Sequence, residues 1–271
     1  MKLTINEALK VSPFSETRLL TKPNKKQQII QDICIVDNFE IENSMEDGVF
    51  VWTTARVLCN VEQAKKFLLQ LHKKNVTGLA VKLGDYWECM PQSLIDLANY
   101  LDFPLLELND RIPFSDQVQC LAMAAENKRV TWLHEKQTLQ SQLRYFSVNG
   151  RKTSEYMELA GECIDHPFAI LSCTGEVYYH NTSYTTENII QKWHGFVNDL
   201  TMDDQDRLIY RIELANRQAC LLIECEEMAN KEEETVFYQT AQMISHYVAK
   251  WRDENEQELP AIMKWQQSLL F

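Results

Sequence analysis

The sequence predicts two domains of different class, an α/β domain with a parallel sheet at the N-terminus and an α+β domain at the C-terminus, joined by a long helix. Three observations predict this arrangement. Between residues 29 and 108, short apolar runs alternate with amphipathic helical stretches, as in βαβ units. Residues 115–146 contain neither glycine nor proline. Beyond residue 153, helical and β-rich stretches follow in a different order, and 271 residues suffice for two domains.

Three helices of the first domain are predicted from their opening residues. Thr4 and Glu7 have the spacing of a capping box, in which each residue satisfies a backbone N–H of the other. Asn60 caps the next helix, with Gln63 at its third position, and apolar residues recur along that helix at helical spacing. Pro91 opens a third helix in the first turn, where proline is favoured.

Four β-rich runs supply the strands of the parallel sheet. They are Ile29–Val36, Val49–Thr54, Leu79–Leu83 and Pro104–Leu108. Right-handed crossovers would place the helices against the faces of this sheet. Because ligands of such sheets bind beyond the carboxyl ends of the strands, we expect the binding edge near residues 53–54, 82–84 and 107–109.

The long helix over residues 115–146 follows the first domain. Its apolar residues recur along one side, but the heptad pattern breaks at Asn127 and Lys128. We predict a packing or dimerisation helix, and a plain interdomain helix is the alternative.

The second domain begins near Thr153. Its order of elements is similar to that of a GAF domain, although no motif supports the similarity. The elements are a helix over 155–164, a hairpin of strands 168–172 and 176–179 around Thr174 and Gly175, strands 211–214 and 218–225 turning at Ala215 and Asn216, and a helix over 232–251.

Composition excludes several classes of protein. The net charge is −12, so neither half carries the basic surface expected of a nucleic-acid-binding domain. No glycine-rich phosphate loop, signal peptide or membrane-length apolar run is present. The eight cysteines show no CxxC spacing and no His/Cys cluster, so we expect no metal or cofactor and read them as small buried hydrophobes in a reducing cytosol.

Four runs in fixed order carry a family resemblance. They are residues 3–9, the run GVFVWTT at 48–54, the run VTGLAVKLGDY at 76–86, and residues 91–114. Through these runs, residues 3–118 resemble the N-terminal domain of the PucR-type, or purine catabolism regulator, family. The chain departs from the family twice. Residues 20–28 replace a glycine-rich segment, and Ala55 replaces the glycine after the paired threonines, which alters any pocket that needs that glycine.

The resemblance implies a transcription regulator with a sensor-like central domain and a C-terminal helix-turn-helix. We expect a PucR-type domain over 1–114, a connecting helix over 115–150, a GAF-like domain over 151–252, and a segment over 253–271 that leads towards a helix-turn-helix absent from this chain. The resemblance further implies a cytoplasmic homodimer without membrane contact. Its effector would be a small nitrogenous metabolite, such as a purine breakdown product or an amino acid, and DNA would be contacted only through the absent helix-turn-helix.

Five residues near the carboxyl edge of the predicted sheet are candidate ligand contacts: Thr53, Thr54, Arg56, Lys82 and Tyr86. The ammonium of Lys82 can meet a carboxylate or carbonyl of a metabolite, or it can form a structural ion pair, for example with Glu107. The threonine hydroxyls can bind a ligand or simply suit a strand. Arg56 can bind a carboxylate or face solvent. Tyr86 belongs to an aromatic segment that forms either a lid or helix packing.

In the second domain, Tyr178, Trp193, Phe196 and Cys220 either line a sensor cavity or pack in the core, while His166 and His180 lack ligand-like spacing. The sequence contains no GxSxG or HExxH motif, so we predict no catalytic residue. Two alternatives to a sensor stay open. One is an enzyme, which requires a paired acid and base in one pocket. The other is a ligand-free dimerisation scaffold, which requires filled cores and a large apolar interface.

Overall fold

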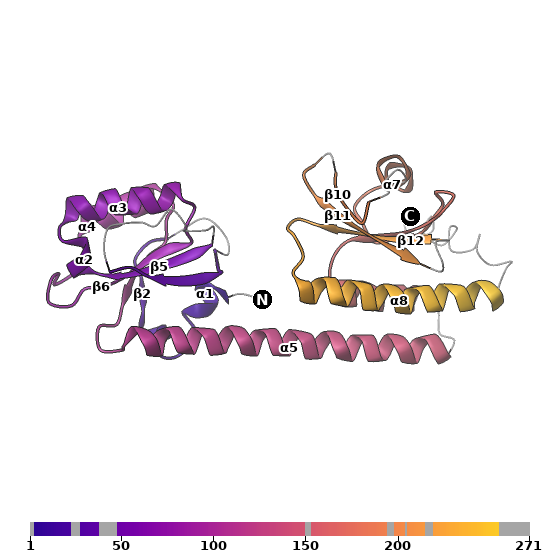
Figure 1. Ribbon diagram of the computed structural model, residues 1–271, viewed down its shortest axis with the longest axis horizontal. Coiled ribbons are helices and arrows are strands. Elements are labelled where there is room, and N and C mark those ends of the chain that lie inside the picture. The colour runs from indigo at the N-terminus through magenta and orange to yellow at the C-terminus, as the bar shows by residue number, and fades with distance from the viewer. Residues whose placement is uncertain are drawn as a thin grey trace. The chain divides into compact units, whose positions relative to one another are not determined.

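The computed structural model describes residues 3–22, 28–37, 48–149, 153–193, 198–203, 205–214 and 219–254. The chain forms two compact units, which divide between Trp132 and Leu133. Each unit has its own sheet (Figure 1). The division falls within one continuous helix, α5 (Phe114–Asn149), so this helix contributes to both units. The long helix predicted over residues 115–146 is therefore confirmed.

The N-terminal unit contains a mixed five-stranded sheet with the order β2-β7-β6-β5-β4. Its four longer strands are parallel, as predicted: β4 (Asp32–Ile35), β5 (Val49–Thr54), β6 (Gly78–Lys82) and β7 (Leu105–Leu108). The fifth, β2 (Arg18–Leu19), pairs antiparallel with β7 and was not predicted. A separate antiparallel pair joins β1 (Leu3–Thr4) to β3 (Ile29–Ile30).

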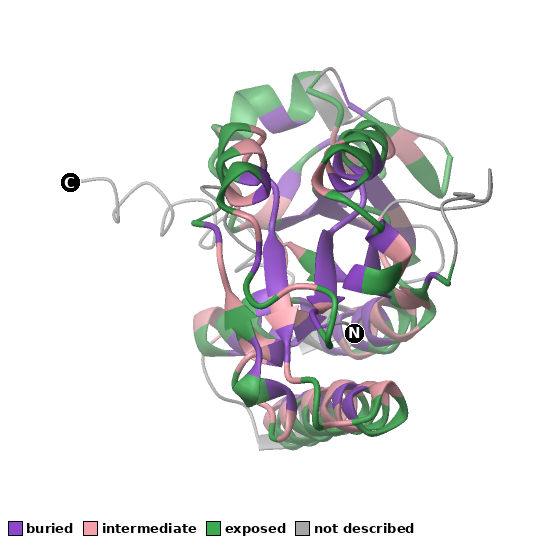
Figure 2. Ribbon diagram, turned by 90° about the vertical axis from the view of Figure 1, so that its left-hand side faces the viewer, coloured by how far each residue is buried: buried purple, intermediate pink, exposed green. Residues whose placement is uncertain are grey.

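Helices lie on both faces of this sheet, because its strands alternate apolar residues to either side. One hydrophobic core contains Val51 and Val81 with residues of α2 (Ala55–Leu58), α3 (Val61–Lys73) and α4 (Gln92–Tyr100). The other contains Trp52 with residues of α1 (Ile5–Ala8), α5 and the 3₁₀ turn η1 (Phe14–Glu16). Figure 2 shows the strands buried between helices whose outer sides are exposed.

The predicted helix starts agree closely with the structure. Thr4 and Glu7 form the complete capping box of α1. The side chain of Asn60 accepts a hydrogen bond from the N–H of Gln63 at the start of α3. Pro91 is the N-cap of α4, one position earlier than the first helical position that we predicted. The short helix α2 was not predicted, since only four residues separate β5 from the loop before α3.

The C-terminal unit contains an antiparallel five-stranded sheet with the order β10-β11-β12-β8-β9. The predicted hairpin is β8 (Phe168–Ser172) and β9 (Val177–His180), and the predicted second pair is β11 (Leu208–Leu214) and β12 (Ala219–Cys225). The edge strand β10 (Leu200–Met202) was not predicted. The turn expected at residues 215–216 lies outside the described residues.

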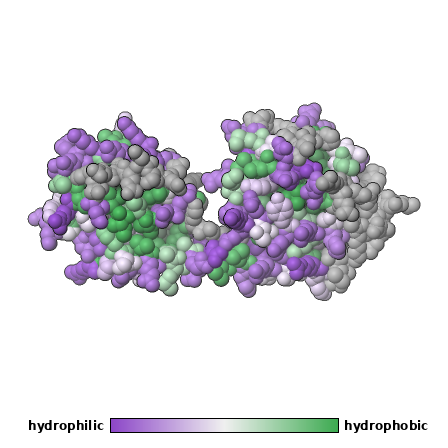
Figure 3. Space-filling model, viewed as in Figure 1, coloured by the Kyte–Doolittle hydropathy of each residue, from purple (hydrophilic) through white to green (hydrophobic). Residues whose placement is uncertain are grey.

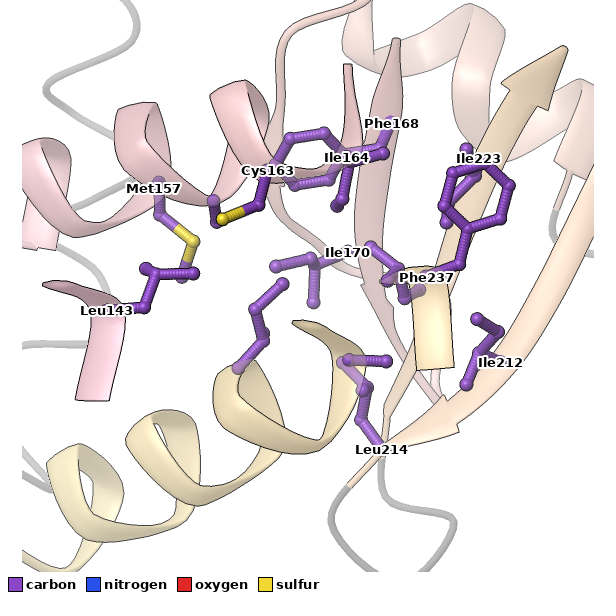
Figure 4. Close-up of a cluster of buried hydrophobic side chains, with 14 of the residues drawn as sticks. Leu143, Met157, Cys163, Ile164, Phe168, Ile170, Ile212, Leu214, Ile223 and Phe237 are labelled. Atoms are coloured by element: carbon purple, nitrogen blue, oxygen red, sulfur yellow. The ribbon is translucent and has the colours of Figure 1, made fainter. Parts of the chain in front are cut away.

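The larger hydrophobic core of the C-terminal unit lies on one face of this antiparallel sheet. There, α6 (Thr153–Ile164), α8 (Lys231–Glu254) and the end of α5 bury residues such as Leu143, Met157 and Phe237 against the strands (Figure 4). The short helix α7 (Thr186–Trp193) contributes Ile189 to a smaller core with Ile209 and Leu222. The α+β class is thus observed, and the similarity to a GAF domain stays a prediction.

Candidate functional site

The two threonines that end β5 do not face the same side of the sheet, since successive residues of a strand point to opposite faces. Thr53 is fully buried, and its hydroxyl donates to the carbonyl of Val36 at 2.8 Å. Thr54 is partly exposed and is the N-cap of α2, without a side-chain capping bond. The hydroxyl proton of Thr53 is therefore already used within the fold, and the two hydroxyls cannot contact one ligand from the same side.

Lys82 ends β6, beside Thr54 in the register of the parallel sheet. Its ammonium donates to the carbonyl of Ile112 and lies 4.5 Å from the centre of the Phe114 ring. Among the described residues no ion pair joins Lys82 to Glu107, whose carboxylate pairs instead with Arg18 at 3.3 Å.

Burial and nearby carboxylates act in opposite directions on the pKa of Lys82. Burial lowers the pKa of this ammonium, and the carboxylates of Asp110 and Asp116 oppose that shift. Since Ile112 lies two residues before α5 begins, this one ammonium links the carboxyl edge of the sheet to the start of the long helix.

Gln117 is the site residue that the sequence reasoning missed. It is completely buried, and its amide nitrogen donates to the carbonyls of Asn109 and Ile112, at 3.3 Å and 3.1 Å. Gln117 and Lys82 therefore share the Ile112 carbonyl. A signal was present, because Gln117 lies three residues after Phe114 and four before Leu121, on the apolar stripe of a helix.

Two buried polar atoms in this part of the unit have no hydrogen-bond partner among the described residues. One is the acceptor Oε1 of Gln117, and the other is the donor Nε1 of Trp52. The Trp52 ring lies 5.8 Å from that of Phe114, which in turn contacts Lys82. Because leaving one buried polar group unpaired costs about 1–3 kcal/mol, such atoms mark a place where a polar ligand or water would stabilise the fold.

The loops beyond β6 and β7 are joined at this edge. Gly84 has a φ of +55° and no atom within 4 Å of where a side chain would begin, and its N–H donates to the Asp110 carboxylate at 3.0 Å. Tyr86 is 58% exposed, and it is the neighbouring Trp87 that packs against the core. Arg56 is exposed on α2. Within the described residues, no hydrogen bond or ion pair joins Arg56 or Tyr86 to Lys82, so ligand binding by the five candidates stays a prediction.

Of the four cavity residues predicted in the second domain, the two whose side chains the structure describes pack in different cores. Tyr178 packs against the large core, whereas Cys220 packs against the small core that contains Ile189. The side chain of Trp193 and all of Phe196 lie outside the described residues. Burial lowers the pKa of both His166 and His180.

The described ranges also bear on metal binding and on membrane insertion. No group of three or more His, Cys, Asp or Glu side chains there is placed to hold a metal ion. No helix in the same ranges is long and apolar enough to cross a membrane.

Comparison with known proteins agrees with the fold of the N-terminal unit. Residues 7–123 match the purine catabolism regulatory protein-like family, PucR. The chain carries a PucR-type domain. This PucR-type domain contains the whole parallel sheet, Lys82, Gln117 and the first turns of α5. The chain is also 25% identical over 202 residues to the "Purine catabolism regulatory protein" of Bacillus subtilis (strain 168), a match that covers 69% of this chain and 36% of that relative.

Proposed function

We propose that this chain is the effector-sensing and dimerising portion of a cytoplasmic transcription regulator that controls purine or other nitrogen-compound metabolism. The observation that carries the proposal is the PucR-type domain over residues 7–123. The name of the Bacillus subtilis relative supports purine catabolism as the regulated process, although the chain spans only about a third of that relative's length. Contact with DNA would require a helix-turn-helix outside the matched region, because the chain itself has a net charge of −12.

The effector would bind at the carboxyl edge of the parallel sheet, on the α5 face. A planar amide or ureido group has both an acceptor and a donor, which suits the unpaired donor of Trp52 and the unpaired acceptor of Gln117. A carbonyl or carboxylate on the same molecule would accept from Lys82 in place of Ile112.

This exchange of the hydrogen-bond acceptor of Lys82 would couple effector binding to the position of α5. In the structure, Lys82 and Gln117 both hold the Ile112 carbonyl, two residues before α5 begins. An effector that takes over the Lys82 ammonium removes one of these ties. The effector shifts the equilibrium between the arrangements of α5 with and without this hydrogen bond. The size of that shift is set by the difference between its affinities for the two arrangements, typically about 1–3 kcal/mol of coupling.

Dimerisation through α5 is the second part of the proposal. Met123 and Val130 lie seven residues apart on α5 and are 60% and 52% exposed. Residues at this spacing lie on one side of a helix, as in helix pairs. Apolar side chains left in water there would be buried by the same helix of a second copy.

A thermal-shift screen tests the sensing function. The chain is heated with allantoin, allantoate, urate, xanthine, guanine or common amino acids, each at millimolar concentration. A compound at a hundred times its Kd stabilises the native state by about 2.7 kcal/mol, which raises Tm by several degrees. We expect one compound to do so, and we expect Lys82→Ala to weaken the shift while Lys66→Ala, at an exposed lysine of α3, retains it.

Other outcomes favour the alternatives. No shift from any compound would favour a ligand-free scaffold. Chemical conversion of a compound during incubation would favour an enzyme. A shift that Lys82→Ala leaves unchanged would place the effector elsewhere in the chain.

A further inference from the structure

A second polar cluster lies in the C-terminal unit, on the sheet face that carries α7. Thr201, Ile209 and Glu224 are neighbours across β10, β11 and β12. Ile209 belongs to the small core with Ile189 of α7, which identifies the face. Asp203 lies just beyond β10 and belongs to the same cluster, because its Oδ2 is 3.8 Å from Nε of Arg207, which also donates to Glu224.

The cluster contains two buried carboxylates and one guanidinium. The side chains of Asp203 and Glu224 are only 1% and 6% exposed. Arg207 donates to Glu224, to the hydroxyl of Tyr184 and to the side-chain oxygen of Gln205. Its guanidinium carbon also lies 5.2 Å from the centre of the Tyr184 ring. Most of the hydrogen-bonding capacity of Arg207 is therefore directed away from Asp203.

Within the part of the chain that the structure describes, only one of the two carboxyl oxygens of Asp203 accepts hydrogen bonds. Its Oδ1 accepts from the N–H groups of Gln205 and Arg207, at 2.8 Å and 2.9 Å. Its Oδ2 accepts no hydrogen bond within the described residues, and the nearest charge is Nε of Arg207 at 3.8 Å. The hydroxyl of Thr201 is likewise buried without a partner there. A buried carboxyl oxygen without a donor is costly, so a bound donor would stabilise the fold at this point.

We infer that this cluster binds a small organic cation with N–H donors, of the ammonium or guanidinium class. The two carboxylates exceed the one guanidinium by a charge, so a cation is preferred over an anion or a neutral molecule. An N–H of the ligand would donate to Oδ2 of Asp203, and a cation of this class has donors but no acceptor. The hydroxyl oxygen of Thr201 would accept a second hydrogen bond from the ligand. This inference concerns a site separate from the sheet edge of the PucR-type domain, and it goes beyond the proposed function, which assigns the effector to that edge.

Methylguanidinium and methylammonium chlorides are suitable probes, since each carries only the group in question. Thermal unfolding of the whole chain is followed with each probe at millimolar concentration, with sodium chloride at matched ionic strength and sodium acetate as the anionic comparison. We expect one cation to raise Tm by a few degrees and acetate to leave it unchanged. No rise with either cation, or an equal rise with sodium chloride, overturns the inference and makes the cluster a structural ion network.

Variants locate the binding. Asp203→Asn keeps an oxygen that can accept from the backbone of Gln205 and Arg207 but removes the charge, so the Tm rise should disappear. Glu227→Gln, at an exposed acid beyond β12, should retain it. If Asp203→Asn does not fold, Thr201→Val provides the test, with a weaker rise expected from the lost hydroxyl. A rise that survives in these variants rules the site out.

The two binding proposals fail independently. Lys82→Ala alters only the sheet edge of the PucR-type domain, so it should leave the response to the cations intact. Loss of that response in Lys82→Ala would show that the cations bind at the sheet edge, and it would overturn the assignment to Asp203.

Discussion

The cysteine side chains range from exposed to fully buried, and burial changes the chemistry of the thiol. Burial raises the pKa of the thiols of Cys163 and Cys225 to about 12, so both are protonated and enclosed at neutral pH. The prediction of small buried hydrophobes is confirmed for these two and wrong for Cys59, Cys89 and Cys173, which are exposed. Since the thiolate is the reactive form, we expect Cys59, Cys89 and Cys173 to react rapidly with Ellman's reagent in the native protein and the buried pair only after unfolding.

Replacement of the three exposed cysteines by serine provides the control. The triple variant should lose the fast phase and keep the slow one that follows unfolding. A fast reaction of Cys163 in the native triple variant would contradict the burial of its thiol.

His166 makes stability depend on pH in a defined direction. Burial is the largest influence on this imidazole and lowers its pKa below 6.5, although nearby carboxylates, Glu233 first, oppose the shift. As pH falls below 6.5, the unfolded chain binds a proton that the folded chain does not. Stability is therefore lost until pH reaches the folded-state pKa. His166→Gln should flatten urea-unfolding stability between about pH 7.5 and 5.5. His134→Gln, at an exposed histidine of α5, should leave that dependence unchanged.

At the scale of elements, an ion pair between Glu7 and Lys128 joins α1 to α5. Lys128 donates to both carboxylate oxygens of Glu7, at 2.7 Å and 2.9 Å, and this contact lowers the pKa of Glu7 below 4.5. Both side chains are 37% exposed, so solvent weakens the pair, and Glu7→Gln should cost only about 0.5–1 kcal/mol at neutral pH.

The sign of the pH effect follows from the lowered pKa. The stabilisation by Glu7 is present above pH 4.5 and is lost as pH falls through its folded-state pKa. Urea unfolding of the native chain and of Glu7→Gln should therefore converge at acidic pH. Glu62→Gln, whose side chain is 80% exposed, is the comparison and should change stability little. A Glu7→Gln difference that persists undiminished at pH 3 would contradict this account.

The proposed dimer depends on the exposed side of α5. Met123→Glu and Val130→Glu place charges where we expect a second copy to pack, so each should dissociate the dimer, as measured by size-exclusion chromatography with light scattering. Tyr100→Glu, at an 87% exposed position on α4, should leave the mass unchanged. A native chain that is monomeric at all accessible concentrations would remove the basis of the proposal.

Local sequence signals predicted most elements, because their causes are local. The capping residues Thr4 and Asn60 act within one helical turn, and the run of β-branched and aromatic residues at 49–54 is buried on both faces. The edge strands β2 and β10 were missed because they have two and three residues and depend on a partner distant in sequence. For the same reason, the sequence indicated Lys82 but not the Ile112 carbonyl that it contacts, thirty residues away.

At the scale of the whole molecule, the two units bury separate sets of side chains. The cores around Val81 and Trp52 contain residues only of the N-terminal unit, whereas those around Phe237 and Ile189 contain residues only of the C-terminal unit. Cooperative unfolding comes from side chains that share one core. Among the described residues, no buried residue belongs to cores of both units, so we expect the units to unfold in separate steps.

Calorimetry of matched core variants tests this separation. Leu79→Ala and Leu221→Ala each truncate a fully buried leucine, one in each unit, at a cost of about 2–5 kcal/mol. We expect two overlapping heat-absorption peaks, with Leu79→Ala lowering the midpoint of only one and Leu221→Ala lowering only the other. If both variants instead lower a single peak together, the two units unfold as one cooperative unit, and their separate cores do not set separate unfolding steps.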